Sequence, residues 1–131
     1  MNKITLHTED YFDSCHRLRN YEGKCCNYHG HTWKLEIWAQ GVDNQKDEIG
    51  ILFDFGEVKK IKELLDHKDL NEMVPYFSDV NPTAENISEF ILNILKLKYI
   101  NLDFRVKLFE TYAGKKTWCQ RQTDNFDINY L

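Results

Sequence analysis

The most constraining feature of the chain is a regular alternation of side chains from His31 to Gln40. One parity of this segment is apolar and comprises Trp33, Leu35, Ile37 and Ala39. The other parity is polar and comprises Thr32, Lys34, Glu36 and Gln40. Such alternation is typical of a β-strand that buries one face and exposes the other. The segment therefore predicts a strand at the border of a hydrophobic core.

Two histidines stand at the entrance of this strand, in phase with Trp33. His29 and His31 are separated only by Gly30, and in an extended backbone side chains two apart leave the same face about 7 Å apart at Cα. The preceding segment, 3–18, is rich in Thr, Tyr, Phe and Ile without Gly or Pro, and predicts a long strand. On that strand His16 is the obvious third histidine.

Three imidazoles that reach one point predict a zinc site. Catalytic zinc is typically held by three protein ligands with a fourth position left open, and imidazole suits this ion. The sequence therefore predicts His16, His29 and His31 as zinc ligands. The alternative is that His29 and His31 form hydrogen bonds in a loop, and that His16 is a half-buried strand residue.

Cys25 and Cys26 allow two further interpretations. As ligands they would close the metal shell, and a closed four-ligand site would only stabilise the fold. As a free thiolate beside the metal, one of them would serve as a base, because a nearby cation lowers the pKa of a thiol.

The remainder of the chain predicts two helices and further strands. Residues 51–53 are expected to be a short strand. A helix is expected to begin near Phe55, capped by Asp54, and to end at Asp66 and His67. Its apolar stripe comprises Val58, Ile61, Leu64 and Leu65. A second helix is expected to follow Pro82 and to run to about Lys98.

Two strands are expected after the second helix. Residues 104–112 alternate, and 116–121 are expected to pair back across Gly114. Strands, two helices and strands again predict an α+β domain with an antiparallel sheet. The length of 131 residues suits one domain, taken as 1–131.

Composition excludes several classes of protein. The formal charge of -4 argues against a nucleic-acid binder with a broad cationic face. No apolar run approaches the roughly 18 residues of a membrane span, and residues 1–10 lack the pattern of a signal peptide. We therefore expect a cytoplasmic protein whose four cysteines are reduced.

Three further residues have side chains suited to catalysis or ligand binding. Asp66 and His67 are adjacent at the expected helix end, where such a pair is usually a solvated terminus and less often catalytic. Glu110 shares the parity of Phe104 and Leu108, so it is expected to point toward the apolar side. A buried carboxylate needs a partner, which is either a cation or backbone amides, or a ligand with two N–H donors in one plane.

With these residues in view, the chain resembles the 6-pyruvoyl-tetrahydropterin synthase superfamily, and more closely its 6-carboxy-tetrahydropterin synthase branch, which serves queuosine biosynthesis. The matching segments are F-D-S-C-H-R-L (12–18), C-C-N-Y-H-G-H (25–31), G-I-L-F-D-F-G (50–56), L-D-H-K-D-L-N (65–71), P-T-A-E-N (82–86) and F-E-T (109–111). Each motif alone is weak, but together they are specific. Two features depart from the family pattern: Cys26 beside Cys25, and Trp118 with Cys119.

The resemblance implies a role for each matching residue. The family's zinc ligands match His16, His29 and His31, and its catalytic cysteine matches Cys25. Its Asp-His pair, contributed by a neighbouring subunit, matches Asp66 and His67. These two residues and the thiolate form a proton-relay set in the family. Its pterin-anchoring glutamate matches Glu110.

The resemblance also implies a fold, an assembly and a reaction. The fold is the tunnelling fold, a four-stranded antiparallel sheet with two helices on one face, assembled into a homo-oligomeric trimer or hexamer with active sites between subunits. The substrate is 7,8-dihydroneopterin triphosphate, a small pterin, with no nucleic acid or membrane partner. The implied products are 6-carboxy-5,6,7,8-tetrahydropterin, acetaldehyde and triphosphate. The alternatives are a 6-pyruvoyl-tetrahydropterin synthase that eliminates only triphosphate, and a non-catalytic, metal-stabilised pterin-binding scaffold.

Overall fold

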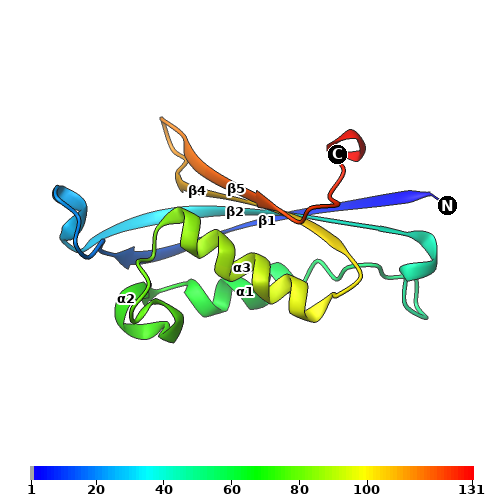
Figure 1. Cartoon of the computed structure of the whole chain (residues 1–131), viewed down its shortest axis with the longest axis horizontal. Coiled ribbons are helices and arrows are strands. Elements are labelled where there is room, and N and C mark those ends of the chain that lie inside the picture. Colours follow the sequence, from blue (N-terminus) through cyan, green and yellow to red (C-terminus); the bar gives the residue numbers. More distant parts are fainter. Residues whose placement is uncertain (1) are drawn as a thin grey trace.

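The computed structural model describes residues 2–131 as one sheet with helices on a single face (Figure 1). The order of strands in the sheet is β3-β1-β2-β4-β5. The strands are β1 (Lys3–His16), β2 (His29–Val42), β3 (Lys68–Asp69), β4 (Asp103–Thr111) and β5 (Thr117–Gln122). The helices are α1 (Glu57–Leu65), α2 (Leu70–Met73) and α3 (Ala84–Lys98). The predicted α+β class is confirmed.

The centre of the sheet is a long hairpin of β1 and β2. The two strands pair antiparallel in one unbroken register, from Lys3 opposite Val42 to His16 opposite His29. β1 ends two residues earlier than predicted, because the next backbone amides bond outside the ladder. Arg17 N donates to Asn71 Oδ1 at 2.9 Å, and Leu18 N donates to the Cys25 carbonyl at 2.8 Å.

The prediction of four antiparallel strands was wrong by one strand. The fifth, β3, is two residues long and pairs parallel with β1, with Lys68 opposite Ser14. It ends at once because the Asp69 carboxylate accepts the amides of Asn71 and Glu72 and so begins α2. A strand of two residues leaves no alternation in a sequence, and α2, a helix of one turn, leaves no period.

The two predicted helices are present, with one boundary moved. α3 begins as expected after Thr83, whose hydroxyl accepts the Asn86 amide at 3.1 Å. α1 begins at Glu57 rather than Phe55, because the Asp54 carboxylate accepts the Gly56 amide in a turn before the helix. The expected strand at 51–53 is irregular backbone.

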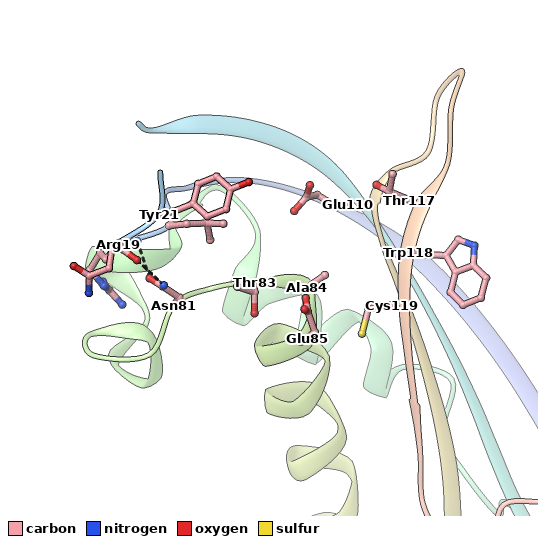
Figure 2. A pocket seen from close by; sticks show the side chains of 12 residues that line it. Arg19, Tyr21, Asn81, Thr83, Ala84, Glu85, Glu110, Thr117, Trp118 and Cys119 are labelled. Carbon is pink, nitrogen blue, oxygen red and sulfur yellow. Dashed lines mark hydrogen bonds between the residues drawn. The ribbon is translucent and has the colours of Figure 1, made fainter. Parts of the chain in front are cut away.

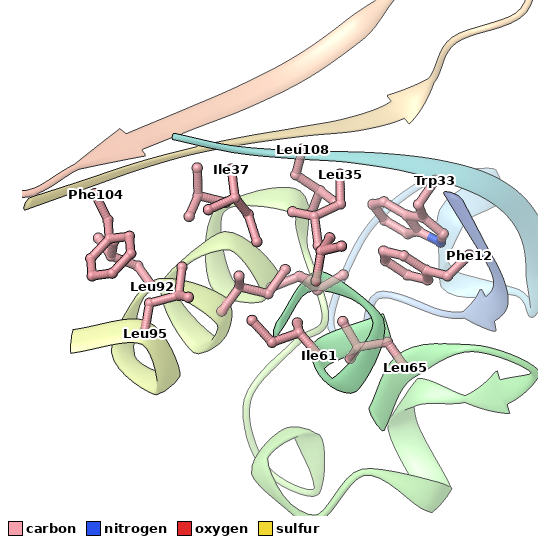
Figure 3. Close-up of a cluster of buried hydrophobic side chains, with 14 of the residues drawn as sticks. Phe12, Trp33, Leu35, Ile37, Ile61, Leu65, Leu92, Leu95, Phe104 and Leu108 are labelled. Carbon is pink, nitrogen blue, oxygen red and sulfur yellow. The ribbon is translucent and has the colours of Figure 1, made fainter. Parts of the chain in front are cut away.

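The core lies between the sheet and helices α1 and α3 (Figure 3). The predicted buried parity of β2 is confirmed, since Trp33, Leu35, Ile37 and Ala39 are all buried. The rings of Phe12 and Trp33 stack with centroids 5.8 Å apart. The predicted stripe of α1 is correct except for Leu64, which is 47% exposed.

No helix within residues 2–131 combines the length and apolarity required to cross a bilayer. Figure 1 shows the connection between β1 and β2 at one end of the sheet and both chain termini toward the other. The predicted metal ligands, at the last residue of β1 and the first residues of β2, therefore lie at the end far from the termini.

Candidate metal centre and active site

The structure brings the three predicted zinc ligands together. One ligand atom from each of His16, His29 and His31 lies within 4.8 Å of the others. His16 pairs directly with His29 across the hairpin, and His31 follows two residues later on the same face. The ring centroids are 4.6 Å apart for His16 and His29, 5.1 Å for His16 and His31, and 4.9 Å for His29 and His31.

Hydrogen bonds select the free nitrogen of two of these rings. His16 Nδ1 donates to the Pro82 carbonyl at 2.7 Å, and His29 Nδ1 donates to the Asn27 carbonyl at 2.8 Å. The proton on Nδ1 leaves Nε2 with a lone pair, which is the arrangement of a metal-ligating histidine with a carbonyl partner. The Nε2 atoms of His16 and His31 are buried without a hydrogen-bond partner among the described residues.

Burial favours the neutral form of two of the three imidazoles, those of His16 and His31. His16 is 1% exposed, and desolvation lowers its pKa, with the neighbouring His29 and His31 acting in the same direction. The pKa of His31 is also lowered, chiefly by desolvation. A neutral imidazole is the form that binds a metal. The unsatisfied nitrogens and the three-nitrogen donor set therefore fit a zinc ion.

The cysteines lie outside this group of ligand atoms. Among residues 2–131, neither Cys25 nor Cys26 has its sulfur in the cluster that the histidines form. Both are in a short 3-10 turn, Lys24–Cys26, and both are partly exposed. The Leu18 amide bonds the Cys25 carbonyl and so ties this turn to the end of β1.

Glu110, on β4, faces the histidines. Its Oε2 lies 4.0 Å from His16 Nε2 and its Oε1 lies 3.9 Å from His31 Nε2. The side chain is 35% exposed, so it is less buried than its parity predicted. The reason is that a cavity of about 700 Å³ opens beside it.

Figure 2 shows this cavity, with the Glu110 carboxylate directed toward Tyr21. Besides Glu110 of β4, its lining comes from three parts of the chain: the loop after β1, the segment that begins α3, and β5. The loop is held by Asn81, whose side chain accepts the Arg19 amide at 2.8 Å and donates to the Arg19 carbonyl at 2.9 Å. Thr83 and Cys119 border the space from α3 and β5.

Sequence reasoning missed Arg19, Asn81 and Cys119 as parts of the site. The Arg19 guanidinium donates to the carbonyls of Phe77 and Val80 at 2.8 and 2.9 Å, so it braces the loop rather than facing a ligand. Contacts between segments sixty residues apart produce no local pattern. The one available signal was the P-T-A-E-N segment, whose first two residues, Pro82 and Thr83, come directly before α3.

Asp66 and His67 form a pair of their own. The Asp66 carboxylate lies 2.9 Å from His67 Nδ1 and also accepts the Asp13 amide at 2.9 Å. That amide is the main cause of the lowered pKa of Asp66. His67 adopts a left-handed backbone, with φ of 54°, and its amide donates to the Asp13 carbonyl.

The pair is not part of the histidine cluster of the same chain. Asp66 and His67 group instead with the carboxylate of Asp13, which has the opposite parity to His16 on β1 and so points to the other face of the sheet. The His67 side chain is 80% exposed. Neither residue lines the cavity beside Glu110.

Comparisons with known proteins agree with this geometry. The model of the family described as 6-pyruvoyl tetrahydropterin synthase matches residues 5–123. A 6-pyruvoyl tetrahydrobiopterin synthase of Dictyostelium discoideum is 32% identical over 123 residues, which cover 82% of this chain and 90% of that protein. A 6-carboxy-5,6,7,8-tetrahydropterin synthase of Rickettsia felis is 33% identical over an alignment of 135 positions. The match covers 85% of this chain and 95% of that protein.

The fold has the same relatives. A solved structure of 6-pyruvoyl tetrahydropterin synthase from Caenorhabditis elegans superposes with a TM-score of 0.74 and covers 95% of this chain and 98% of its own, at 24% identity. The architecture is therefore the tunnelling fold, here with the additional strand β3. Because the family model covers nearly the whole chain, the chain belongs to the 6-pyruvoyl tetrahydropterin synthase family.

Proposed function

We propose that this chain is a zinc-dependent lyase that converts 7,8-dihydroneopterin triphosphate to 6-carboxy-5,6,7,8-tetrahydropterin, acetaldehyde and triphosphate, for queuosine and related 7-deazapurine synthesis. One observation carries the proposal. Three histidines converge on one point, and the Glu110 carboxylate, at the edge of a cavity of about 700 Å³, lies within 4.0 Å of the Nε2 atoms of two of them, His16 and His31. A metal site beside an acid in a cavity of this size suits a small heterocyclic substrate.

His16, His29 and His31 would hold the zinc ion. When bound, zinc polarises substrate oxygens and lowers the pKa of the protons that must leave. The carbonyls of Pro82 and Asn27 support the bound state, because they fix the orientation of His16 and His29.

Glu110 would bind and orient the pterin ring. A carboxylate accepts two parallel N–H donors from a planar group, and the edge of a pterin offers such donors. The Glu110 carboxylate opens onto the cavity, so a ring anchored there would place its side chain beside the histidines. Holding the substrate in this orientation would accelerate the reaction, because the base would then stay close to the proton that it removes.

Cys25 would be the base, with Asp66 and His67 completing the proton relay. The exposed His67 side chain lies outside the ligand cluster of the same chain's histidines, which suits a pair that acts in a neighbouring subunit. We therefore propose a homo-oligomer, a trimer or hexamer, with the active site between subunits. A cytoplasmic location suits this chemistry, because the four free cysteines stay reduced there.

A 6-pyruvoyl-tetrahydropterin synthase is the second candidate. In its favour, the sequence identity of this chain to the Dictyostelium discoideum 6-pyruvoyl tetrahydrobiopterin synthase is nearly as high as its identity to the Rickettsia felis protein. The carboxy reaction is favoured by the interval of three residues between Cys25 and His29, which resembles that branch of the family.

Product analysis separates the candidates. Zinc-loaded protein is incubated with 7,8-dihydroneopterin triphosphate, the pterin is identified by mass, and aldehyde is assayed in the same reaction. Acetaldehyde with a 6-carboxy pterin supports the proposal. A pyruvoyl pterin without aldehyde supports the second candidate, and unchanged substrate bound to the protein supports the non-catalytic scaffold.

A further inference from the structure

Four unsatisfied polar atoms gather around the histidine cluster. Within residues 2–131, the buried side-chain atoms without a hydrogen-bond partner are Ser14 Oγ, His16 Nε2, His31 Nε2, Trp33 Nε1 and Arg105 Nε. All except Arg105 Nε belong to the end of the β1–β2 hairpin that carries the histidines. The metal explains the two histidine nitrogens but not the hydroxyl of Ser14, which is 7% exposed.

A buried hydroxyl without a partner costs free energy, so such groups are rare unless something meets them. Ser14 is on β1, where it has the same parity as Phe12 and His16 and therefore faces the core. Alanine would fill the same space without this cost. The position of Ser14 thus points to a group that needs its oxygen.

The strand register identifies that group as His31. Ser14 lies directly opposite His31 in the β1–β2 ladder, and side chains opposite each other on one face have Cβ atoms about 4.5–5.5 Å apart. Both residues also border one open hollow beside β1 and β3. Rotation of the Ser14 side chain about χ1 moves its Oγ atom between staggered positions, so Oγ can turn toward the His31 imidazole.

His31 is the one histidine of the three that lacks a second partner. His16 and His29 each donate Nδ1–H to a backbone carbonyl, whereas the His31 ring has no such carbonyl partner among the described residues and its Nε2 is buried without a hydrogen bond. A metal-ligating histidine almost always donates its other ring N–H to an oxygen, which fixes the tautomer and the ring orientation.

We propose that Ser14 is a positioning residue of the metal centre, whose Oγ accepts the Nδ1–H of His31 directly or through one water molecule. This bond holds the ring of His31 with Nε2 toward the ion. It gives His31 the support that Pro82 and Asn27 give to the other two histidines. The inference rests on the proposed zinc site and gives a role to Ser14, which lies in the F-D-S-C-H-R-L motif but to which the resemblance assigns none.

The test compares Ser14→Ala with Ser14→Thr, which keeps the hydroxyl and suits a strand. Zinc affinity is measured by competition with a chelator. We expect the dissociation constant to rise about 10- to 100-fold in Ser14→Ala, the usual effect of losing such a partner, and to stay near the wild-type value in Ser14→Thr. The visible spectrum of the cobalt-loaded protein should change in Ser14→Ala alone.

Thermal unfolding of the metal-free proteins separates positioning from a merely structural role. Because the Ser14 Oγ atom has no hydrogen-bond partner among residues 2–131, Ser14→Ala should cost the metal-free protein little or no stability. Ser88→Ala is the matched control: Ser88 is also buried, but its hydroxyl donates to the Glu85 carbonyl at 2.9 Å. This control should lose stability and keep its zinc affinity.

Wild-type zinc affinity in Ser14→Ala overturns the role of Ser14, as does an equal loss of affinity in Ser88→Ala. A loss in Ser14→Ala that Ser14→Thr shares also overturns it. If the wild-type protein binds no zinc, the metal centre itself fails together with this inference. Tight binding by wild type and Ser14→Ala alike leaves the metal centre intact and removes only the proposed hydrogen bond.

Discussion

Adjacent cysteines precede the histidines proposed as metal ligands, and only Cys25 matches the family's catalytic position. Neither sulfur belongs to the ligand cluster. Cys25→Ala should therefore lower turnover by about 10²- to 10⁴-fold, the usual contribution of a general base, while zinc content stays at the wild-type level. Steady-state kinetics and metal analysis of the same preparation measure both.

Cys26→Ala is the control for this prediction and should remain active, because it leaves the Cys25 side chain in place. Full activity in Cys25→Ala would support a non-catalytic scaffold or a different base. Loss of activity in Cys26→Ala alone would assign the base to Cys26.

Glu110 faces the cavity with no hydrogen-bond partner from the described residues, so its charge is available to a ligand. Glu110→Gln should raise the KM about 10- to 100-fold, because hydrogen bonds to a charged group contribute about 1.5–3 kcal/mol. The melting temperature should change little. Glu89→Gln, which alters only an exposed ion pair with Arg121, should leave the KM unchanged. Equal substrate affinity in Glu110→Gln and wild type would remove the proposed anchoring role.

Burial lowers the pKa of His16 and His31 below the ordinary histidine value of 6.5. Below that value the unfolded metal-free chain binds more protons than the folded chain, so the free energy of unfolding must decrease as the pH falls toward the folded pKa. Denaturant unfolding in the presence of a chelator, from about pH 7.5 to about pH 5.5, should show this decrease. His16→Asn should flatten it, and a wild-type curve already flat would contradict the assignment.

The histidine cluster was predictable because a ladder converts spacing along the chain into proximity in space. His29 and His31 share a face once 29–42 is a strand, and a plain hairpin register brings His16 opposite His29. The position of His67 was not predictable in the same way. It depends on a left-handed backbone and on a hydrogen bond to Asp13, neither of which a periodic pattern encodes.

Among the elements, the long ones were predictable and the short ones were not. β2 and α3 have many residues in one period, so single deviations do not hide the pattern. The predicted start of α1 was wrong because the Asp54 carboxylate accepts the Gly56 amide in a turn before the helix, rather than capping the helix itself. The expected strand at 51–53 was wrong because a short apolar run is also typical of buried irregular backbone, here with Leu52 and Phe53 inside.

Leu64 and Leu65 of α1 provide a matched pair for a stability prediction. Leu65 is fully buried in the core, whereas Leu64 points outward. Leu65→Ala should lower the free energy of unfolding by about 2–5 kcal/mol through loss of contacts and formation of a cavity. Leu64→Ala should change it by less than about 0.5 kcal/mol. Urea denaturation of both variants measures the difference, and equal effects would contradict the placement of the helix.

For the whole molecule, the proposed site needs Cys25 from one subunit and His67 from its neighbour. Cys25→Ala and His67→Ala should each be inactive alone. When the two are mixed in equal amounts and allowed to exchange subunits, each site has an even chance of receiving either intact residue, so about a quarter of wild-type turnover should return. Co-expression from two tagged genes and assay of the mixed oligomer measure this.

Mixing wild type with Cys25→Ala is the control and should give activity in proportion to the intact cysteines. No recovery in the mixture of the two variants, despite demonstrated subunit exchange, would place His67 in the site of its own chain.

The unbroken ladder between β1 and β2 has a consequence for quality control of folding. If one strand slipped by a single residue, His16 would point away from His29 and His31, and Phe12 would leave its stack on Trp33. A molecule with this error would lose both the proposed metal site and its core packing. Metal binding at the proposed site would therefore show that the β1–β2 hairpin of a newly made molecule has paired in the correct register.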